Sequence, residues 1–296
     1  MKPAPFSFVR PRGLQQALEA LAADPGAKVL AGGQSLVPLL SMRLAAPTTL
    51  VDINALPDLG HVRVDEAGVH VGALARHAEV LASDDVRRAQ PLLALALAQV
   101  AHPTIRNRGT CVGSLVHADA AAELPMVLSL LGGTVTVASV SGTRTVPASE
   151  LYAGPLESTL HHDEIALEAT FPALASGEGV AFDEIARRHG DYALCGVGAV
   201  LRVEDETVVS ARAGYLSVAD VPTVVDLTDA LGGVVSTGST DAAGELALQS
   251  LDPAGDLHAT AAYRAQLVRV LTARVLRAAY DDARARWSVE RGRADA

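Results

Sequence analysis

A glycine pair lies within a sequence pattern typical of a strand, a turn, a helix and a second strand. Residues 28–31 form a short apolar run, Gly32 and Gly33 follow, a predicted helix starts at Ser35, and residues 49–53 form another apolar run. Glycine adopts positive φ without strain and lets a ligand approach the main chain closely. Backbone N–H groups exposed at such a turn can bind an anion. The pattern therefore predicts a strand–turn–helix–strand unit whose turn can hold a phosphate.

A second segment of the same character follows at residues 104–114. It contains Gly109, Thr110 and Gly113 and leads into residues 117–125. One such segment alone is as often a plain turn as a phosphate site. Two of them in one globular chain favour a dinucleotide that both segments contact. The usual dinucleotide fingerprint, G-x-G-x-x-G after the first strand, is absent, so the sequence does not predict a Rossmann fold.

The composition of the 296-residue chain narrows the classes of function. Hydrophobic residues make up 49% and charged residues 20%, as in an ordinary folded protein with two domains. The net charge of −10 argues against nucleic acid or an anionic membrane as the main partner. The start of the chain lacks a signal-peptide pattern, and no apolar run approaches the ~20 residues that span a bilayer. We therefore expect no membrane span and a cytoplasmic location.

Two cysteines, Cys111 and Cys195, occur in unrelated contexts. They cannot supply the four thiolates of a plant-type iron–sulfur cluster, and they do not form a disulfide framework. We interpret each as a small buried hydrophobic residue.

Periodicity and turn residues predict an α+β architecture with two domains. The composition changes at residues 175–179, which predicts a nucleotide-binding first domain at residues 1–177, a smaller α+β domain at 178–287 and a frayed tail at 288–296. The expected helices are residues 14–21, 77–101 with a break near Pro91, and 120–131. The expected strands are residues 62–64, 69–74, 134–140, 164–171, 195–203 and 207–218, with mostly helical sequence after them.

The last predicted helix carries apolar residues on one face, namely Tyr263, Leu267, Val270, Leu271 and Val275. Its arginines Arg264, Arg269 and Arg277 lie largely off that face. We expect them to be solvated, with contact to a partner chain as the alternative.

Three groups of polar residues allow more than one interpretation. Arg106 and Arg108 could anchor a loop or contact a phosphate, and the sequence favours neither. His117 and Asp119 are better explained as a hydrogen-bonded turn than as a catalytic pair, because no nucleophile is in register. Adjacent residues of a strand point to opposite faces, so we interpret His161 and His162 as an exposed turn rather than a metal site. The sequence thus predicts no catalytic residue and no metal ligand.

Several motifs in a fixed order closely resemble the FAD-binding medium subunit of molybdenum hydroxylases, the family of aerobic carbon monoxide dehydrogenase and xanthine dehydrogenase. The matching segments are residues 31–39, 51–53, 105–110, 117–125, 187–193 and 258–264. The resemblance implies a two-lobed FAD-binding domain of the vanillyl-alcohol oxidase and p-cresol methylhydroxylase type. A smaller C-terminal α+β domain of the carbon monoxide dehydrogenase flavoprotein type is implied after it.

The resemblance also assigns cofactor-binding residues. Residues 31–36 resemble a first loop that holds the FAD diphosphate, and residues 110–114 resemble a second loop on its other side. An acidic residue that fixes the adenosine portion corresponds to Glu123, an aromatic residue near the isoalloxazine ring to Tyr192, and Asp119 lies in a further matching motif. The implied cofactor-binding residues are Ala31, Gly32, Gly33, Gln34, Ser35, Leu36, Thr110, Gly113, Ser114, Asp119, Glu123 and Tyr192.

One position departs from the family pattern, which has paired glycines in the second loop. Val112 stands at the first of them, beside Cys111. If that position requires positive φ, valine is strained there by ~1 kcal/mol or more. We therefore expect a shifted loop with FAD binding retained.

The resemblance implies an electron-transfer subunit of a three-chain enzyme. The partners would be a small subunit with [2Fe–2S] clusters and a large molybdopterin subunit, as a dimer of heterotrimers. Electrons would pass from the clusters to FAD in this chain and on to an external acceptor. The alternatives are a stand-alone FAD-dependent oxidase or dehydrogenase and a scaffold protein that has lost the flavin.

Overall fold

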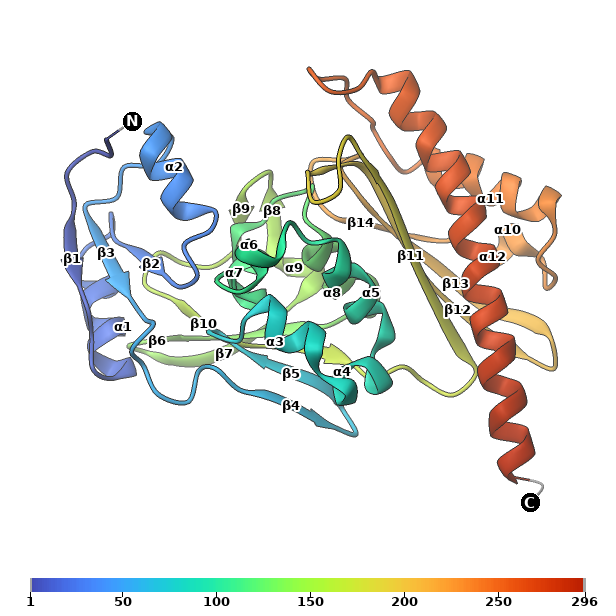
Figure 1. Cartoon of the computed structure of the whole chain (residues 1–296), viewed down its shortest axis with the longest axis horizontal. Helices are drawn as coiled ribbons and strands as arrows, with labels where there is room; N and C mark the ends of the chain where they lie inside the picture. The colour runs from blue at the N-terminus through green and yellow to red at the C-terminus, as the bar shows by residue number, and fades with distance from the viewer. Residues whose placement is uncertain (1, 295–296) are drawn as a thin grey trace.

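Three larger β-sheets and one two-stranded sheet follow one another through residues 2–294, the part of the chain that the computed structural model describes (Figure 1). Each larger sheet has a hydrophobic core beside it. In Figure 1 the N-terminal sheet lies at the left, the central sheet in the middle, and the C-terminal sheet with the long last helix at the right. The structure is thus a mixed α+β fold, as the sequence pattern predicted, with a two-lobed N-terminal part, as the family resemblance implied.

The N-terminal lobe is a parallel three-stranded sheet in the order β1-β3-β2 with two helices. Its elements are β1 Ser7–Val9, α1 Leu14–Ala22, β2 Lys28–Leu30, α2 Leu36–Met42 and β3 Thr49–Asp52. Helix α1 buries Ala17, Leu18 and Leu21, which lie on one face at helical spacing. Strands β2 and β3 are parallel neighbours joined through α2, so the predicted strand–turn–helix–strand unit is confirmed.

The central lobe is an antiparallel five-stranded sheet in the order β4-β5-β10-β6-β7. Its strands are β4 Val62–Asp65, β5 Gly68–Gly72, β6 Thr134–Ser139, β7 Gly142–Pro147 and β10 Ile165–Pro172, and the two-stranded sheet is β8 Tyr152–Gly154 and β9 Glu157–Ser158. The helices are α3 His77–Ala82, α4 Asp84–Ala89, α5 Pro91–Gln99, α6 Pro103–Arg106, α7 Cys111–His117, α8 Glu123–Leu131 and α9 Ala148–Leu151.

Two predicted helices of this lobe differ in their boundaries. The stretch predicted from residue 77 to 101 is divided into α3, α4 and α5, because the side chain of Ser83 caps α4 and Gln90 precedes Pro91 at the start of α5. The helix predicted from residue 120 begins at Glu123 instead. Residues 119–122 form a turn in which Asp119 Oδ1 accepts a hydrogen bond from Ala121 N at 2.9 Å.

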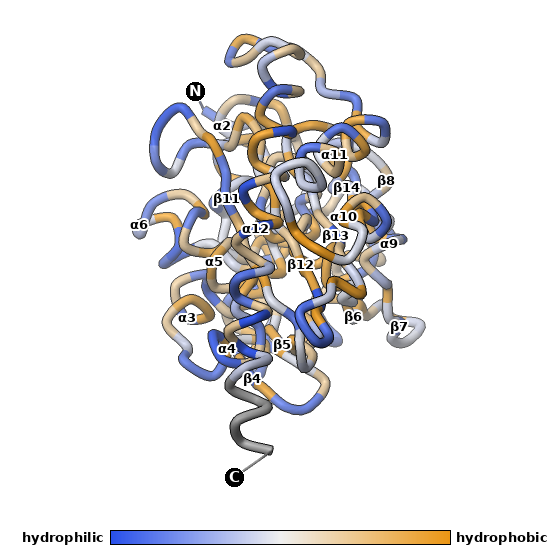
Figure 2. Tube along the Cα trace, turned by 90° about the vertical axis from the view of Figure 1, so that its right-hand side faces the viewer, coloured by the Kyte–Doolittle hydropathy of each residue, from blue (hydrophilic) through white to orange (hydrophobic). Residues whose placement is uncertain are grey.

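The C-terminal sheet is antiparallel, in the order β11-β12-β13-β14, and is covered on both faces. Its elements are β11 Glu178–Ala186, β12 Ala193–Glu204, β13 Thr207–Leu216, β14 Thr223–Asp226, α10 Thr228–Leu231, α11 Thr237–Leu248 and α12 Ala261–Ala294. Alternate residues of β12 such as Val197 and Ala199 belong to the core shared with α12. Gly198 between them faces Met126 of α8. Figure 2 shows hydrophobic residues concentrated along β12, behind α12.

The two parts of the chain therefore share a core. Val180, Val200 and Leu216 of the C-terminal sheet belong to the cluster that also contains the central lobe's helices α5 and α8. We retain a division at residue 177, just before β11, as a proposal for the domain boundary.

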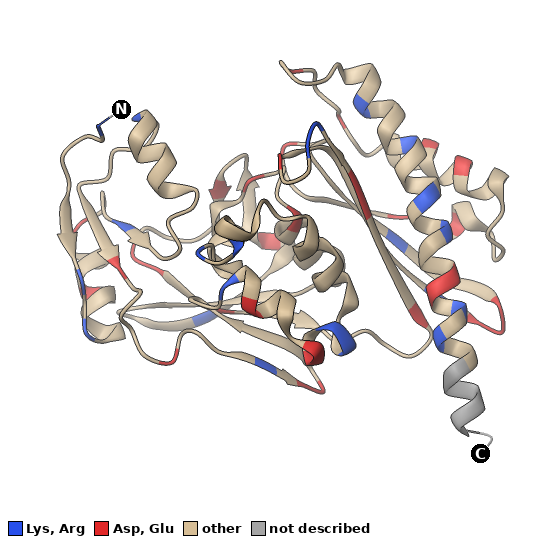
Figure 3. Cartoon of the chain, viewed as in Figure 1, with Lys and Arg blue, Asp and Glu red and all other residues tan. Residues whose placement is uncertain are grey.

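Helix α12 carries several arginines along the part coloured in Figure 3, but they are not all solvated. Our expectation was wrong for Arg264, which is only 6% exposed because it donates to Leu194 O, Ser217 O and Asp256 Oδ2 at 2.6–2.7 Å. The predicted apolar face is partly wrong as well, since Tyr263 and Val270 are 47% and 41% exposed. The helix also runs to Ala294 with no proline to interrupt it, past residue 288 where we expected the tail to fray. Residues 295 and 296 of that tail lie outside the described residues.

Among residues 2–294, no helix combines the length and the apolar character that a membrane crossing requires.

Candidate functional site

The first loop, residues 31–36, leads from β2 into α2 and leaves its main chain open. Gly33 has a φ of 72°, which permits the turn. The carbonyls of Gly32 and Gly33 accept hydrogen bonds from the exposed Gln34 side chain and from Val37 N. The backbone N–H groups of residues 32–35, in contrast, donate to no other described residue. These free donors, half-buried or exposed, are what an anion would need.

The second loop, residues 110–114, forms the start of α7. Thr110 is the N-cap, and its Oγ1 accepts a hydrogen bond from Gly113 N at 3.2 Å. Cys111 and Val112 point into the core, whereas Gly113 and Ser114 are half-buried. The positive end of the helix dipole and the first amides of α7 therefore lie at this loop.

Val112 is not strained. It has helical backbone within α7, and its φ is not positive. The shifted loop that we expected is therefore unnecessary, because an L-residue fits this position without the left-handed conformation that glycine favours.

The two loops lie directly against each other, although they are far apart in sequence. A Cβ placed on Gly32 would lie 2.5 Å from Arg108 O, 2.9 Å from Gly109 Cα and 3.1 Å from Thr110 N. Only a residue without a side chain allows this approach of two main chains. The free amides of the first loop therefore lie close to the start of α7 in the second loop.

Arg76 and Asn54 link the two loops through hydrogen bonds. Arg76 donates to Arg108 O at 2.6 Å and to Asn54 Oδ1 at 2.9 Å, and Asn54 Nδ2 donates to Ala31 O at 2.8 Å. The sequence analysis missed both residues, because nothing in their local pattern marks a contact across this distance in the chain. This network fixes the spacing of the two loops.

His77 lies behind the second loop. It is 5% exposed, its backbone N–H donates to Gly109 O at 3.1 Å, and its ring packs against Gly109. Burial lowers the pKa of His77 to about 4, so the ring is neutral at ordinary pH. Neither ring nitrogen has a hydrogen-bond partner among the described residues.

Arg106 anchors a loop, because its guanidinium group donates to two backbone carbonyls. Of the two alternatives, loop anchor or phosphate contact, these hydrogen bonds favour the first. The Nη1 of Arg106 donates to Val100 O at 2.7 Å and to Ala101 O at 2.9 Å. The side chain of Arg108 is exposed, and a phosphate contact stays open for that residue.

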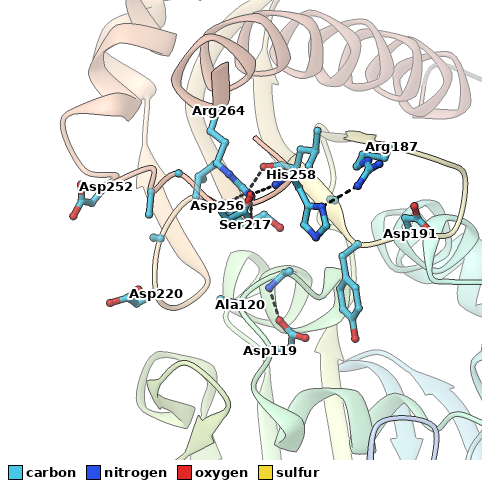
Figure 4. Close-up of a pocket in the computed structure, with 18 of the residues that line it drawn as sticks. Asp119, Ala120, Arg187, Asp191, Ser217, Asp220, Asp252, Asp256, His258 and Arg264 are labelled. Atoms are coloured by element: carbon cyan, nitrogen blue, oxygen red, sulfur yellow. Dashed lines mark hydrogen bonds and ion pairs between the residues drawn. The ribbon is translucent and has the colours of Figure 1, made fainter. Parts of the chain in front are cut away.

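Asp119 and Tyr192 come together at the junction of the two domains. Both line a pocket of about 550 Å³, to which residues 119–121 contribute one side and the C-terminal part of the chain the rest (Figure 4). Tyr192 follows β11 and is 67% exposed. Within this pocket Arg264 pairs with Asp256, and Arg187 contacts His258 at 3.0 Å. The pocket lies between elements that the sequence places more than 60 residues apart.

A pair of carboxyl groups from different domains lies at the same junction. Glu123 is the first residue of α8, and Glu184 lies on β11. Burial, with the nearby charge of Asp119, raises the pKa of Glu123 to about 7. Burial, with the charges of Glu123 and Asp183, raises the pKa of Glu184 to about 8. Glu184 was missed by the sequence analysis, and its Oε2 has no hydrogen-bond partner among the described residues.

The structure also places the histidines and cysteines that the sequence analysis considered. His161 and His162 lie in an exposed turn, as predicted. Cys111 and Cys195 are free and buried. Within residues 2–294, no group of three or more His, Cys, Asp or Glu side chains could hold a metal ion.

Family comparisons account for almost the entire chain. Residues 4–174 match the family described as the FAD binding domain in molybdopterin dehydrogenase, and residues 180–279 match the carbon monoxide dehydrogenase flavoprotein C-terminal domain. A relative from Paenarthrobacter nicotinovorans, the 6-hydroxypseudooxynicotine dehydrogenase complex subunit alpha, is 41% identical over 96% of this chain and 97% of its own. The nicotine 6-hydroxylase medium subunit of the same organism is 39% identical over 93% and 98%.

Solved structures agree with the sequence matches. Quinoline 2-oxidoreductase from Pseudomonas putida 86 superposes with a TM-score of 0.90 at 36% identity, covering 96% of this chain and 99% of its own. Carbon monoxide dehydrogenase from Hydrogenophaga pseudoflava gives 0.90 at 31% identity, covering 95% and 99%.

Proposed function

Because the chain belongs to the FAD-binding medium subunits of the molybdenum hydroxylases, we propose that it carries electrons within a complex of three kinds of subunit. Electrons would come from [2Fe–2S] clusters of a small partner subunit, reach FAD here and continue to an external acceptor. A large molybdopterin subunit would oxidise the substrate. We also propose that the complex is a dimer of heterotrimers and lies in the cytoplasm.

The adjacency of the two loops carries this proposal. We assign the FAD diphosphate to the free N–H groups at Gly32, Gly33, Gln34 and Ser35 on one side, with Ala31 and Leu36 flanking them. Thr110, Gly113 and Ser114 would face it from the start of α7. Backbone amides and a helix N-terminus are the donors that phosphate groups prefer. The loop spacing is fixed before binding by Arg76 and Asn54, so little ordering is required when the cofactor binds.

We assign the isoalloxazine ring to the domain junction near Tyr192, and Asp119 to the same part of the site. Glu123 is proposed as the acidic contact of the adenosine portion, on the resemblance alone. Glu123 also lies at the domain junction beside Asp119 and Glu184. The competing assignment is therefore a contact between Glu123 and the isoalloxazine ring. Bound FAD supplies the redox chemistry, and the chain's own residues bind and orient it.

Expression of the chain alone tests the proposal. We expect purified protein to carry FAD that is released on denaturation, and not to oxidise the organic substrate of the complex. Adding the two partner subunits should restore turnover. A colourless protein without affinity for FAD would contradict the assignment and favour the scaffold alternative. Substrate oxidation by the lone chain would favour the stand-alone enzyme.

A further inference from the structure

The segment of residues 187–192 joins β11 to β12 of the C-terminal sheet and contacts the central lobe on the way. Within it, Gly190 has a φ of 84°, and a Cβ there would lie 2.5 Å from His102 Cε1, 2.7 Å from His102 Nδ1 and 3.0 Å from Ala101 O. The imidazole of His102 thus lies on the Cα of Gly190. The contact joins residues 88 positions apart in sequence, in two different domains.

The lobe side of this contact is held firmly. Ala101 has a left-handed φ of 43°, which is unfavourable for alanine. Arg106 keeps it there by donating to both Val100 O and Ala101 O. Backbone groups of Ile105 and Arg106 also donate to His102 O at 2.9 and 3.0 Å. The main chain that carries the His102 ring is therefore held in place.

The other end of the segment is tied to its own domain. Arg187 contacts His258 at 3.0 Å, and Asp191 N donates to Arg188 O at 3.1 Å within the turn (Figure 4 labels Arg187, His258 and Asp191). Tyr192 comes directly after these anchors and is exposed. Its side chain is not packed in the core, so its position follows its main chain, which the segment holds on one side and Ala193, the first residue of β12, on the other.

We propose that His102 and Gly190 are positioning residues that fix the segment 187–192, and with it Tyr192, against the flavin ring. This inference rests on the proposed function, since it needs FAD at the domain junction. The same stretch of chain continues from His102 through α6 to Arg108 and Gly109, which adjoin Gly32. One short stretch therefore contacts both the diphosphate loops and the segment that carries Tyr192.

The test uses the FAD-loaded full chain with the substitution Gly190→Ala. The new methyl group meets the His102 ring and lies 3.0 Å from the backbone Ala101 O, and an L-residue is strained at this φ, so the segment moves off the lobe. We expect tryptic cleavage after Arg187 and Arg188 to accelerate about tenfold, since cleavage follows the population of the open segment. Flavin fluorescence should rise, because an aromatic side chain no longer lies at the ring.

Two further variants separate this contact from general strain. Gly232→Ala is the matched control: its φ is 56°, yet a Cβ there meets nothing closer than 4.0 Å. It should change neither measurement. The double variant His102→Ala/Gly190→Ala gives the methyl group the space of the ring, and we expect it to recover part of the wild-type protection. Where Gly190→Ala fails to fold, His102→Ala alone should still loosen the segment.

Three results are decisive. Normal FAD content with wild-type cleavage and fluorescence in both Gly190→Ala and His102→Ala overturns the inference. Equal effects of Gly190→Ala with and without the His102 ring overturn it as well. A wild-type chain that binds no FAD contradicts the proposed function instead, and the cleavage measurement, which needs no flavin, still decides whether His102 holds the segment.

Discussion

Single residues decide whether the two loops can adjoin, and Gly32 is the clearest of them. We predict that Gly32→Ala weakens FAD binding, because the methyl group would push Arg108 O and Gly109 Cα away. Overpacking of this kind costs about 1–3 kcal/mol, or roughly fivefold to a hundredfold in Kd. Titration of the apoprotein with FAD measures the change. Gly60→Ala, with no atom within 4 Å of its Cβ, is the control and should bind FAD normally. Equal affinity of both variants would contradict the loop contact.

His77 makes a prediction about pH. The unfolded chain's histidine, with a pKa of 6.5, takes up a proton as pH falls, whereas buried His77, with a pKa of about 4, does not. The contribution of His77 to the free energy of unfolding is therefore fully present above pH 6.5. It falls by on the order of 3 kcal/mol as the pH drops from 6.5 to about 4. His77→Phe removes both the titration and two unpartnered buried nitrogens. We expect it to be at least as stable as wild type at pH 7, with an advantage that grows toward pH 5.

Urea unfolding of the two proteins at both pH values measures that advantage. Comparing variant with wild type cancels the other titrating groups. An advantage that does not change with pH would contradict the neutral burial of His77.

At the scale of elements, we expect FAD binding to depend on the N-terminus of α7. Thr110→Ala removes the cap of Gly113 N and should lower the free energy of unfolding by about 1 kcal/mol. It should also weaken FAD binding, because the first amides of α7 are then less well ordered. Ser236→Ala removes the corresponding cap of α11, where Ser236 Oγ accepts from Ser239 N at 3.1 Å. That control should lose similar stability and keep its FAD affinity. Thr110→Ser, which keeps the hydroxyl, should restore both properties.

Element boundaries also show what local pattern misses. Strands β1, β7, β8, β9, β11 and β14 were not predicted. Most are short, or they are edge strands with exposed residues, so alternation of polar and apolar residues is weak in them. The long helix α12 was predicted, but its buried arginine was not, because the partner Asp256 belongs to a loop outside the helix.

For the whole molecule, Glu123 and Glu184 at the domain junction make the free energy of unfolding depend on pH. Both carboxyls have folded pKa values above the ordinary 4.5, so the folded FAD-free chain binds more protons than the unfolded chain between about pH 4.5 and 8. Stability is therefore fully present below pH 4.5 and falls as pH rises through 7 and 8. Glu184→Gln should remove part of this decline, on the order of 2 kcal/mol at pH 8.5.

The melting temperature of the FAD-free chain from pH 5.5 to 8.5 measures this dependence. Glu66→Gln changes an exposed carboxyl in the turn between β4 and β5, and it should leave the pH profile as in wild type. A Glu184→Gln profile parallel to that of wild type would show that this carboxyl is not protonated in the folded chain.

The sequence by itself determined the local features of this protein and its family. Gly33 has the positive φ that the turn after β2 requires, and Thr110 caps the helix that follows it. The order of the motifs indicates the family, and the family indicates the cofactor. Such features depend on neighbours within a few residues, and the chain carries them whatever its tertiary structure. The identity of the loops that bind FAD was predicted from them, and it stays a prediction.

Only the tertiary structure decided which distant residues meet. It placed Gly32 against Gly109, joined the loops through Arg76 and Asn54, buried Arg264 with Asp256, and brought Glu184 to Glu123. The energies of these contacts come from desolvation and from close approach of main chains, and both depend on packing across elements far apart in sequence. No local pattern records these contacts, which is why the sequence alone missed Arg76, Asn54 and Glu184 and led us to expect a solvated Arg264.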